Sequence, residues 1–158
     1  MIRRVRLALV CCIVGFVIGF SDYIVRGAVW QMQLHYRRPI SLLDRVAYIT
    51  YYSYVSLHFV VPLAILFLVL FFALSRPIFQ HWFVSMPVAV VLGAAIPVIL
   101  LYGFSYRGYP EMARLYLYGF LPRCILASLS MFACGTWLSR RHQSSNPAMQ
   151  PTAGPRTA

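Results

Sequence analysis

Two basic side chains lie where they could form a polar site inside long apolar segments. His58 falls within the apolar run 46–74, and Arg123 falls within a second run at 115–138. On two helices that enter a membrane from the same side, both residues reach a similar depth, because each helical residue adds about 1.5 Å. A charge at the centre of a bilayer is unfavourable by about 3 kcal/mol or more, so an intramembrane arginine indicates a functional site by default. The sequence therefore predicts a candidate anion or proton site here.

Neighbouring polar residues extend this candidate site. Tyr51, Tyr54 and His58 are spaced so that they share one face of a helix. Asp22 is the only acidic residue close to the apolar interior of any segment. The predicted polar intramembrane site consists of six residues, namely Arg123, His58, Tyr54, Tyr51, Asp22 and Ser128.

Three interpretations of Arg123 are open at this point. Its side chain could extend to the headgroups if the lipid-buried part of its helix begins at Pro122. It could pair structurally with a tyrosine or with Asp22, or it could bind an anion or take part in proton transfer. For His58, a hydrogen bond between helices is the alternative to a proton relay.

The remaining motifs favour a protein without catalytic chemistry. A membrane bundle that holds haem needs a second intramembrane histidine beside His58, and no paired His, Asp or Glu has metal-ligand spacing. Neither a G-x-S-x-G nucleophile motif nor a phosphate-binding loop is present. The cysteines form no C-x-x-C pair and read as small buried residues, at Cys11, Cys12, Cys124 and Cys134. We expect no enzyme, no cofactor and no metal site.

Four apolar segments of helical length must position these residues. A lipid core about 30 Å thick needs about 20 apolar residues in a helix. Segments of that kind lie at about 7–25, 46–74, 82–104 and 115–138, in a chain with 61% hydrophobic residues. The sequence predicts an all-α fold, an integral membrane four-helix bundle with four transmembrane helices over residues 1–142. Residues 143–158 are rich in Ser, Pro, Ala and Thr and are predicted to be a disordered C-terminal tail.

Local signals predict where helices begin and where small residues let them approach. Ser41 and Asp44 form a capping-box-like start, Pro110 suits a first helical turn, and residues 30–36 alternate as in an extended segment on the headgroup layer. The predicted helix-packing positions are Gly15, Gly19, Ala89 and Gly93. Such faces could also join a second copy into a homo-oligomer or attach the chain to a larger membrane complex.

Charge and tyrosine placement indicate how the chain meets the membrane. The net charge is +11, and all 14 Lys and Arg residues are arginines, most of which flank the apolar segments. Anionic lipids are therefore the expected counter-charge, with no nucleic acid partner. All 11 tyrosines lie at or beyond the ends of the segments opposite the termini. They predict either an interfacial girdle or a tyrosine-lined vestibule.

Two functions remain open for a multi-pass protein of the cell membrane. Residues 146–153 resemble the read-through end of some translated bacterial gene cassettes, and we expect a bacterial inner membrane. Both termini should lie on the same side, which Arg3, Arg4 and Arg6 predict to be cytoplasmic. The first function is a non-catalytic scaffold, accessory subunit or lipid- or partner-interacting module. The alternative is a small permease or channel with an anion and proton site at Arg123 and His58.

Overall fold

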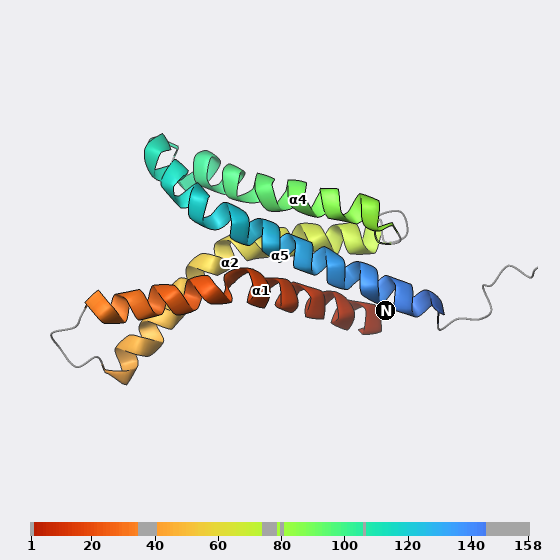
Figure 1. Ribbon diagram of the computed structural model, residues 1–158, viewed down its shortest axis with the longest axis horizontal. Helices are drawn as coiled ribbons and strands as arrows, with labels where there is room; N and C mark the ends of the chain where they lie inside the picture. Colours follow the sequence, from red (N-terminus) through yellow and green to blue (C-terminus); the bar gives the residue numbers. More distant parts are fainter. Residues whose placement is uncertain (1, 35–40, 74–78, 80, 106, 145–158) are drawn as a thin grey trace, which may run out of the picture.

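The computed structural model describes residues 2–34, 41–73, 79, 81–105 and 107–144, and nearly all of them are helical (Figure 1). The elements are α1 (Ile2–Leu34), α2 (Leu42–Ala73), α4 (Trp82–Val98), the π-helix η1 (Ile99–Ser105) and α5 (Pro110–Ser144). Four helical stretches are long and apolar enough to cross a membrane, namely Arg4–Gln33, Leu42–Ala73, Trp82–Phe104 and Pro110–Arg140. This confirms the predicted all-α fold with four long apolar helices.

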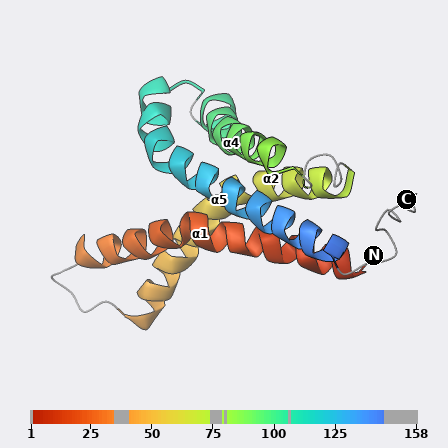
Figure 2. The same cartoon turned by 45° about the vertical axis from the view of Figure 1, so that its right-hand side comes forward.

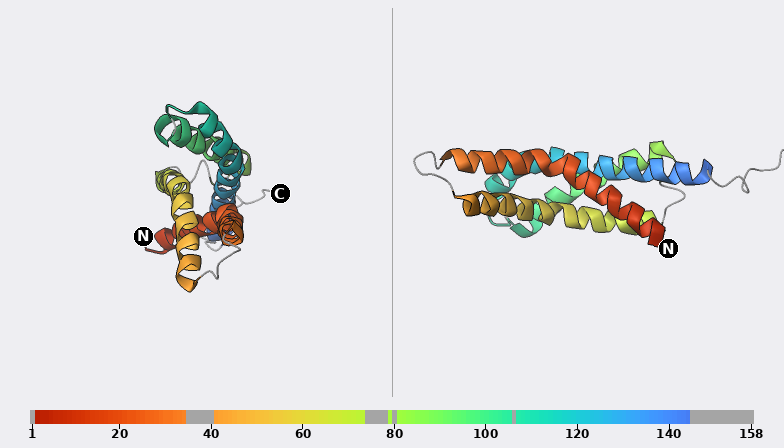
Figure 3. Two further views of the ribbon diagram at one scale, coloured as in Figure 1. Left: turned by 90° about the vertical axis from the view of Figure 1, so that its left-hand side faces the viewer. Right: turned by 90° about the horizontal axis from the view of Figure 1, so that it is seen from below.

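The helices run up and down, and α5 lies between α1 and α4 (Figures 1 and 2). The start of α1 and the end of α5 share one end of the bundle, which we call the terminal end, and the opposite end is the distal end. Toward the distal end, α1 and α2 diverge from η1 and α5 (Figures 1 and 3). The bundle is therefore more open at its distal end.

Glycines bring α1 close to α5. A Cβ atom at Gly15 would lie 2.4 Å from Cγ of Met131, and one at Gly19 would lie 2.6 Å from Cβ of Ala127. Both distances are far below ordinary van der Waals contact, so only glycine allows this approach of the two helices. The G-x-x-x-G step of the first segment thus faces α5 of the same chain.

A second close contact joins α4 to α5. A Cβ atom at Gly93 would lie 2.6 Å from Cα of Ile125, and Ala89, one turn earlier, is fully buried. The small-residue faces predicted from the sequence are therefore both directed at α5. Association with a second copy or another protein would have to use other surfaces.

Phenylalanines fill the terminal half of the bundle. Phe67 of α2, Phe132 of α5 and Phe79 of the connection between α2 and α4 are fully buried. Their ring centroids lie 5.4 Å apart for Phe67 and Phe132, and 5.2 Å apart for Phe79 and Phe132. Edge-to-face and stacked contacts at these distances are those that aromatic rings prefer. This half of the bundle has a continuous packed core.

The predicted start of α2 is confirmed. The backbone N–H of Ser41 donates to Oδ2 of Asp44 at 3.2 Å, and the backbone N–H of Asp44 donates to Oγ of Ser41 at 3.1 Å. These reciprocal bonds satisfy two of the N–H groups that the first turn of a helix leaves without partners.

The prediction of an extended segment at 30–36 is wrong for residues 30–34, which continue α1. Tyr23, Gly27 and Trp30 recur at intervals of four and three, and a Cβ atom at Gly27 would lie 2.5 Å from the Tyr52 ring. Packing against α2 therefore stabilises a helix here, because a helix places these three residues on one face and an extended segment does not. Residues 35 and 36 lie outside the described residues.

The predicted third segment, 82–104, coincides with the helical stretch Trp82–Phe104, but its helix type changes, and the end of the fourth helix differs from the prediction. The third segment is an α-helix only to Val98, and the π-helix η1 follows directly after Pro97 and Val98. A proline lacks the N–H that a continuous α-helix needs, which accounts for a change of helix type nearby. α5 continues past the predicted end at 138 to Ser144, because no proline or glycine interrupts 136–144. The remainder of the predicted tail, 145–158, lies outside the described residues.

Candidate functional site

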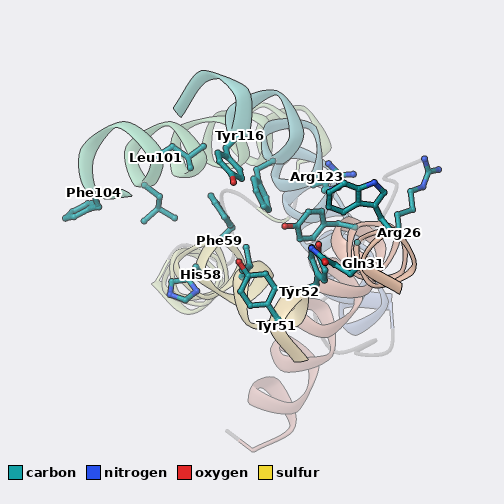
Figure 4. Close-up of a pocket in the computed structure, with 16 residues that line it drawn as sticks. Arg26, Gln31, Tyr51, Tyr52, His58, Phe59, Leu101, Phe104, Tyr116 and Arg123 are labelled. Carbon is teal, nitrogen blue, oxygen red and sulfur yellow. The ribbon is translucent and has the colours of Figure 1, made fainter. Parts of the chain in front are cut away.

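A cavity of about 900 Å³ lies in the distal half, between α1, α2, η1 and α5 (Figure 4). Eight of its 16 lining residues carry Phe, Tyr or Trp rings, namely Tyr23, Trp30, Tyr51, Tyr52, Phe59, Phe104, Tyr116 and Phe120. Such a wall is suited to an apolar or aromatic group, with few polar contacts to orient it.

Helical periodicity explains why these side chains converge. Tyr116, Phe120 and Arg123 follow one another by four and three residues on α5, so they share one helix face. Phe120 anchors this face to α2, because its ring stacks on Phe59 with centroids 4.3 Å apart. It also meets the Tyr23 ring of α1 edge to face at 5.0 Å. Phe120 thus joins three helices at the inner wall of the cavity.

Asp22 and two arginines form a charged cluster at one edge of the cavity. Oδ1 of Asp22 accepts a hydrogen bond from Nε of Arg26 at 2.6 Å, one turn away on α1. Oδ2 of Asp22 lies 3.7 Å from Nη2 of Arg123, which comes from α5. Arg26 and Arg123 both line the cavity. The pairing of Arg123 with Asp22, one of the three interpretations left open by the sequence, is thus present in the structure.

Arg123 has two further contacts. Its Nη1 donates to the backbone carbonyl of Gly119, and its Cζ lies 5.2 Å from the centroid of the Tyr23 ring, within cation–π range. The Arg123 side chain is 27% exposed, compared with 79% for Arg26. The cluster therefore combines one guanidinium that is partly buried and held on two sides with one that is largely exposed.

His58 lies on a different wall of the same cavity. Figure 4 shows it on α2, on the opposite side of the cavity from Arg123. Its Nδ1 lies 3.0 Å from the backbone carbonyl of Tyr54, and the two rings meet edge to face with centroids 4.6 Å apart. The hydrogen bond expected between helices is thus made within α2.

The other predicted site residues divide between the cavity and elsewhere. Tyr51 lines the cavity, whereas Tyr54 is an exposed neighbour of His58 and is not among the lining residues. Ser128 is fully buried in α5, and its Oγ has no hydrogen-bond partner among the described residues. Five residues rotate a helix by about 140° beyond a full turn, which directs Ser128 away from the face that carries Arg123.

Sequence reasoning missed the α1 wall of the cavity and the aromatic anchor on α5. Tyr23, Gly27 and Trp30 form a helical stripe that could have been recognised, but the first helix was expected to end at residue 25. Phe120 was overlooked because an isolated phenylalanine in an apolar segment carries no distinctive signal.

Searches against protein-family models, curated proteins and solved structures find no match for this chain. Within the described ranges, no group of three or more His, Cys, Asp or Glu side chains could hold a metal ion. The geometry of the cavity is therefore the basis for a functional proposal.

Proposed function

We propose that this small polytopic membrane protein is a non-catalytic, lipid-interacting module whose distal cavity takes up the apolar part of a membrane-dissolved molecule. The observation that carries the proposal is the aromatic lining of a cavity of about 900 Å³. Pockets that hold small molecules have volumes of about 300–1,000 Å³, so an acyl chain or an aromatic body fits this space.

The depth of the cavity supports a ligand from the membrane. A lipid core takes about 20 helical residues. Counted from the terminal-end residues Arg4, Ala73, Trp82 and Arg140, this length reaches residues 24, 53, 102 and 120. The cavity-lining residues of all four spans lie close to these positions. The cavity would then open at the boundary between acyl chains and headgroups, where tyrosines also favour placement.

The packed terminal half supports binding over passage. Phe67, Phe79 and Phe132 are fully buried beneath the cavity, toward the terminal end. A solute that entered from the distal side would meet this core, so the geometry favours a site that holds its ligand and returns it to the same leaflet. We place the termini in the cytoplasm because of the arginines at the start of the chain, which puts the cavity at the opposite leaflet.

Tryptophan fluorescence can test whether lipid enters the cavity. Trp30 lines the cavity and is one of 3 tryptophans, so the double variant W82F/W137F keeps it as a single reporter. In vesicles of acyl-brominated phosphatidylcholine, bromine atoms inside the cavity should quench Trp30 strongly.

A matched pair of variants separates cavity binding from ordinary lipid contact. Val55 lines the cavity, whereas Val69 lies on the same helix, is 56% exposed and is outside the cavity lining. Val55→Phe should fill space and lower the quenching of Trp30 by half or more, while Val69→Phe should leave it unchanged. Equal quenching in all three proteins would reject the proposal.

A small permease or channel is the second candidate, favoured by the presence of Arg123 and His58 in one cavity. In this function, Arg123 contacts an anion and His58 exchanges a proton. Chloride and phosphate uptake into protein-containing vesicles distinguishes the two proposals. Uptake that is lost in Arg123→Leu, with assembly intact, would favour the permease, whereas the lipid-interacting module predicts no uptake above protein-free vesicles.

A further inference from the structure

We propose that Arg26 and Arg123 form an anion subsite at the edge of the distal cavity, which selects an anionic phospholipid, with Asp22 as a built-in competitor for the same two guanidinium groups. This inference rests on the proposed function, because the acyl part of that lipid would occupy the aromatic cavity.

The charge balance of the cluster favours an anion. Both arginines line the cavity, and Asp22 is the acidic group that pairs with them. One carboxylate shared by two guanidiniums leaves one positive charge uncompensated at the cavity edge. A lipid phosphate that carries one negative charge would balance the cluster.

The geometry leaves donors for that phosphate. The 3.7 Å separation between Arg123 Nη2 and Asp22 Oδ2 exceeds the 2.7–2.9 Å that is typical of a charge-assisted hydrogen bond. Arg26 binds Asp22 through Nε, and its side chain is 79% exposed. A guanidinium carries five N–H donors in a planar fork that matches phosphate oxygens. The exposed Arg26 side chain can therefore reorient modestly and share one phosphate with Nη2 of Arg123.

Two contacts that do not involve Asp22 fix the position of the Arg123 guanidinium. The Gly119 carbonyl accepts from Nη1, and the Tyr23 ring lies beneath the guanidinium. These contacts fix the side chain without neutralising its charge. Fixing a binding group in advance reduces the entropy lost when a ligand binds.

The position of the cluster favours a lipid over a soluble anion. The arginines lie at the depth expected for the distal headgroup boundary, and the aromatic cavity adjoins them directly. A free phosphate would use the arginines but leave the aromatic wall without a ligand. A phospholipid contacts both surfaces, and anionic headgroups are attracted to basic side chains near the surface.

Two substitutions that should change the lipid preference in opposite directions test this assignment. Arg123→Gln removes a phosphate donor, so the preference for brominated phosphatidylglycerol over brominated phosphatidylcholine, read from Trp30 quenching, should fall about fivefold. Asp22→Asn removes the competing carboxylate, so the same preference should rise by about the same factor. Arg123→Lys keeps the charge but loses the fork and should lie between Arg123→Gln and the parent protein.

Controls separate this site from general attraction to a basic protein. Arg45 is exposed near the start of α2 and does not line the cavity, so Arg45→Gln should change the preference by less than twofold. Inorganic phosphate added at millimolar concentration should not displace the lipid; displacement would show that the site serves a soluble anion and would overturn the proposal.

A purely structural ion pair gives a different pattern. In that case Arg123→Gln and Asp22→Asn would both reduce thermal stability and would shift lipid preference in the same direction or not at all, which would overturn the inference. Quenching by brominated phosphatidylcholine that stays sensitive to Val55→Phe would show that the cavity still binds lipid. The proposed function would then stand while the anion subsite failed.

Discussion

The terminal and distal halves of the bundle are built from the same helices but are packed differently. In the terminal half, Phe67 and Phe132 pack edge to face and are fully buried. In the distal half, four tyrosines join three phenylalanines, the helices diverge, and a cavity with a charged edge lies between them (Figures 1 and 4). A ring with a hydroxyl can face headgroups and water, so added tyrosines suit a surface that is not sealed by packing.

The helix contacts that fix both halves should be the most sensitive to substitution. Gly93→Leu introduces a side chain where a single added carbon would already lie 2.6 Å from the α5 backbone. Because a backbone cannot move aside easily, we expect a loss of about 3 kcal/mol in unfolding free energy. Reversible denaturant unfolding in detergent micelles measures this loss. Gly103→Leu is the matched control, since its nearest neighbouring atom lies at 4.0 Å, and an equal loss in both variants would contradict the prediction.

The packing difference between the halves can be measured with two phenylalanines. Phe132→Ala leaves a void in the closed core and should lower unfolding free energy by about 2 kcal/mol, mainly through lost packing, since lipid removes most of the transfer contribution. Phe120→Ala should lower it by less, because one side of Phe120 already faces the cavity. The same unfolding assay tests both variants. A larger loss for Phe120→Ala would mean that the distal half carries the stability of the bundle.

The smallest expected effect concerns the distal start of α2. Ser41→Ala removes the hydroxyl that accepts from the Asp44 backbone N–H, which should weaken the first turn by about 1 kcal/mol. Hydrogen exchange should speed up for the first turn of α2 and remain unchanged near Phe67. Faster exchange throughout α2 would show that the cap supports the whole helix and not its distal end alone.

Features governed by local composition could be predicted from the sequence. Length and hydropathy defined four helices, and the Ser41 and Asp44 spacing defined the start of α2. The length of α1 could not be predicted, because residues 30–34 alternate in polarity and only the contact of Gly27 with Tyr52 selects the helix.

The candidate site could be predicted only in part, because some of its residues are marked by local sequence and others are not. Arg123, His58 and Tyr51 were singled out by their rarity or spacing, and they line one cavity. Arg26 and Phe120 were not, because their roles depend on how α1 and α5 rotate against each other. Counting residues gives depth along a helix, but rotation is set by packing between helices.

The glycines also differ in how freely this protein can evolve. The three atoms nearest to a Cβ at Gly27 all belong to the Tyr52 ring, so a larger residue at 27 could be compensated by a smaller one at 52. At Gly93, the nearest atoms belong to the α5 backbone, which no single compensating mutation can shrink. The wall of the cavity can therefore be remodelled by paired substitutions, while the junction of α4 and α5 offers no such exchange at Gly93.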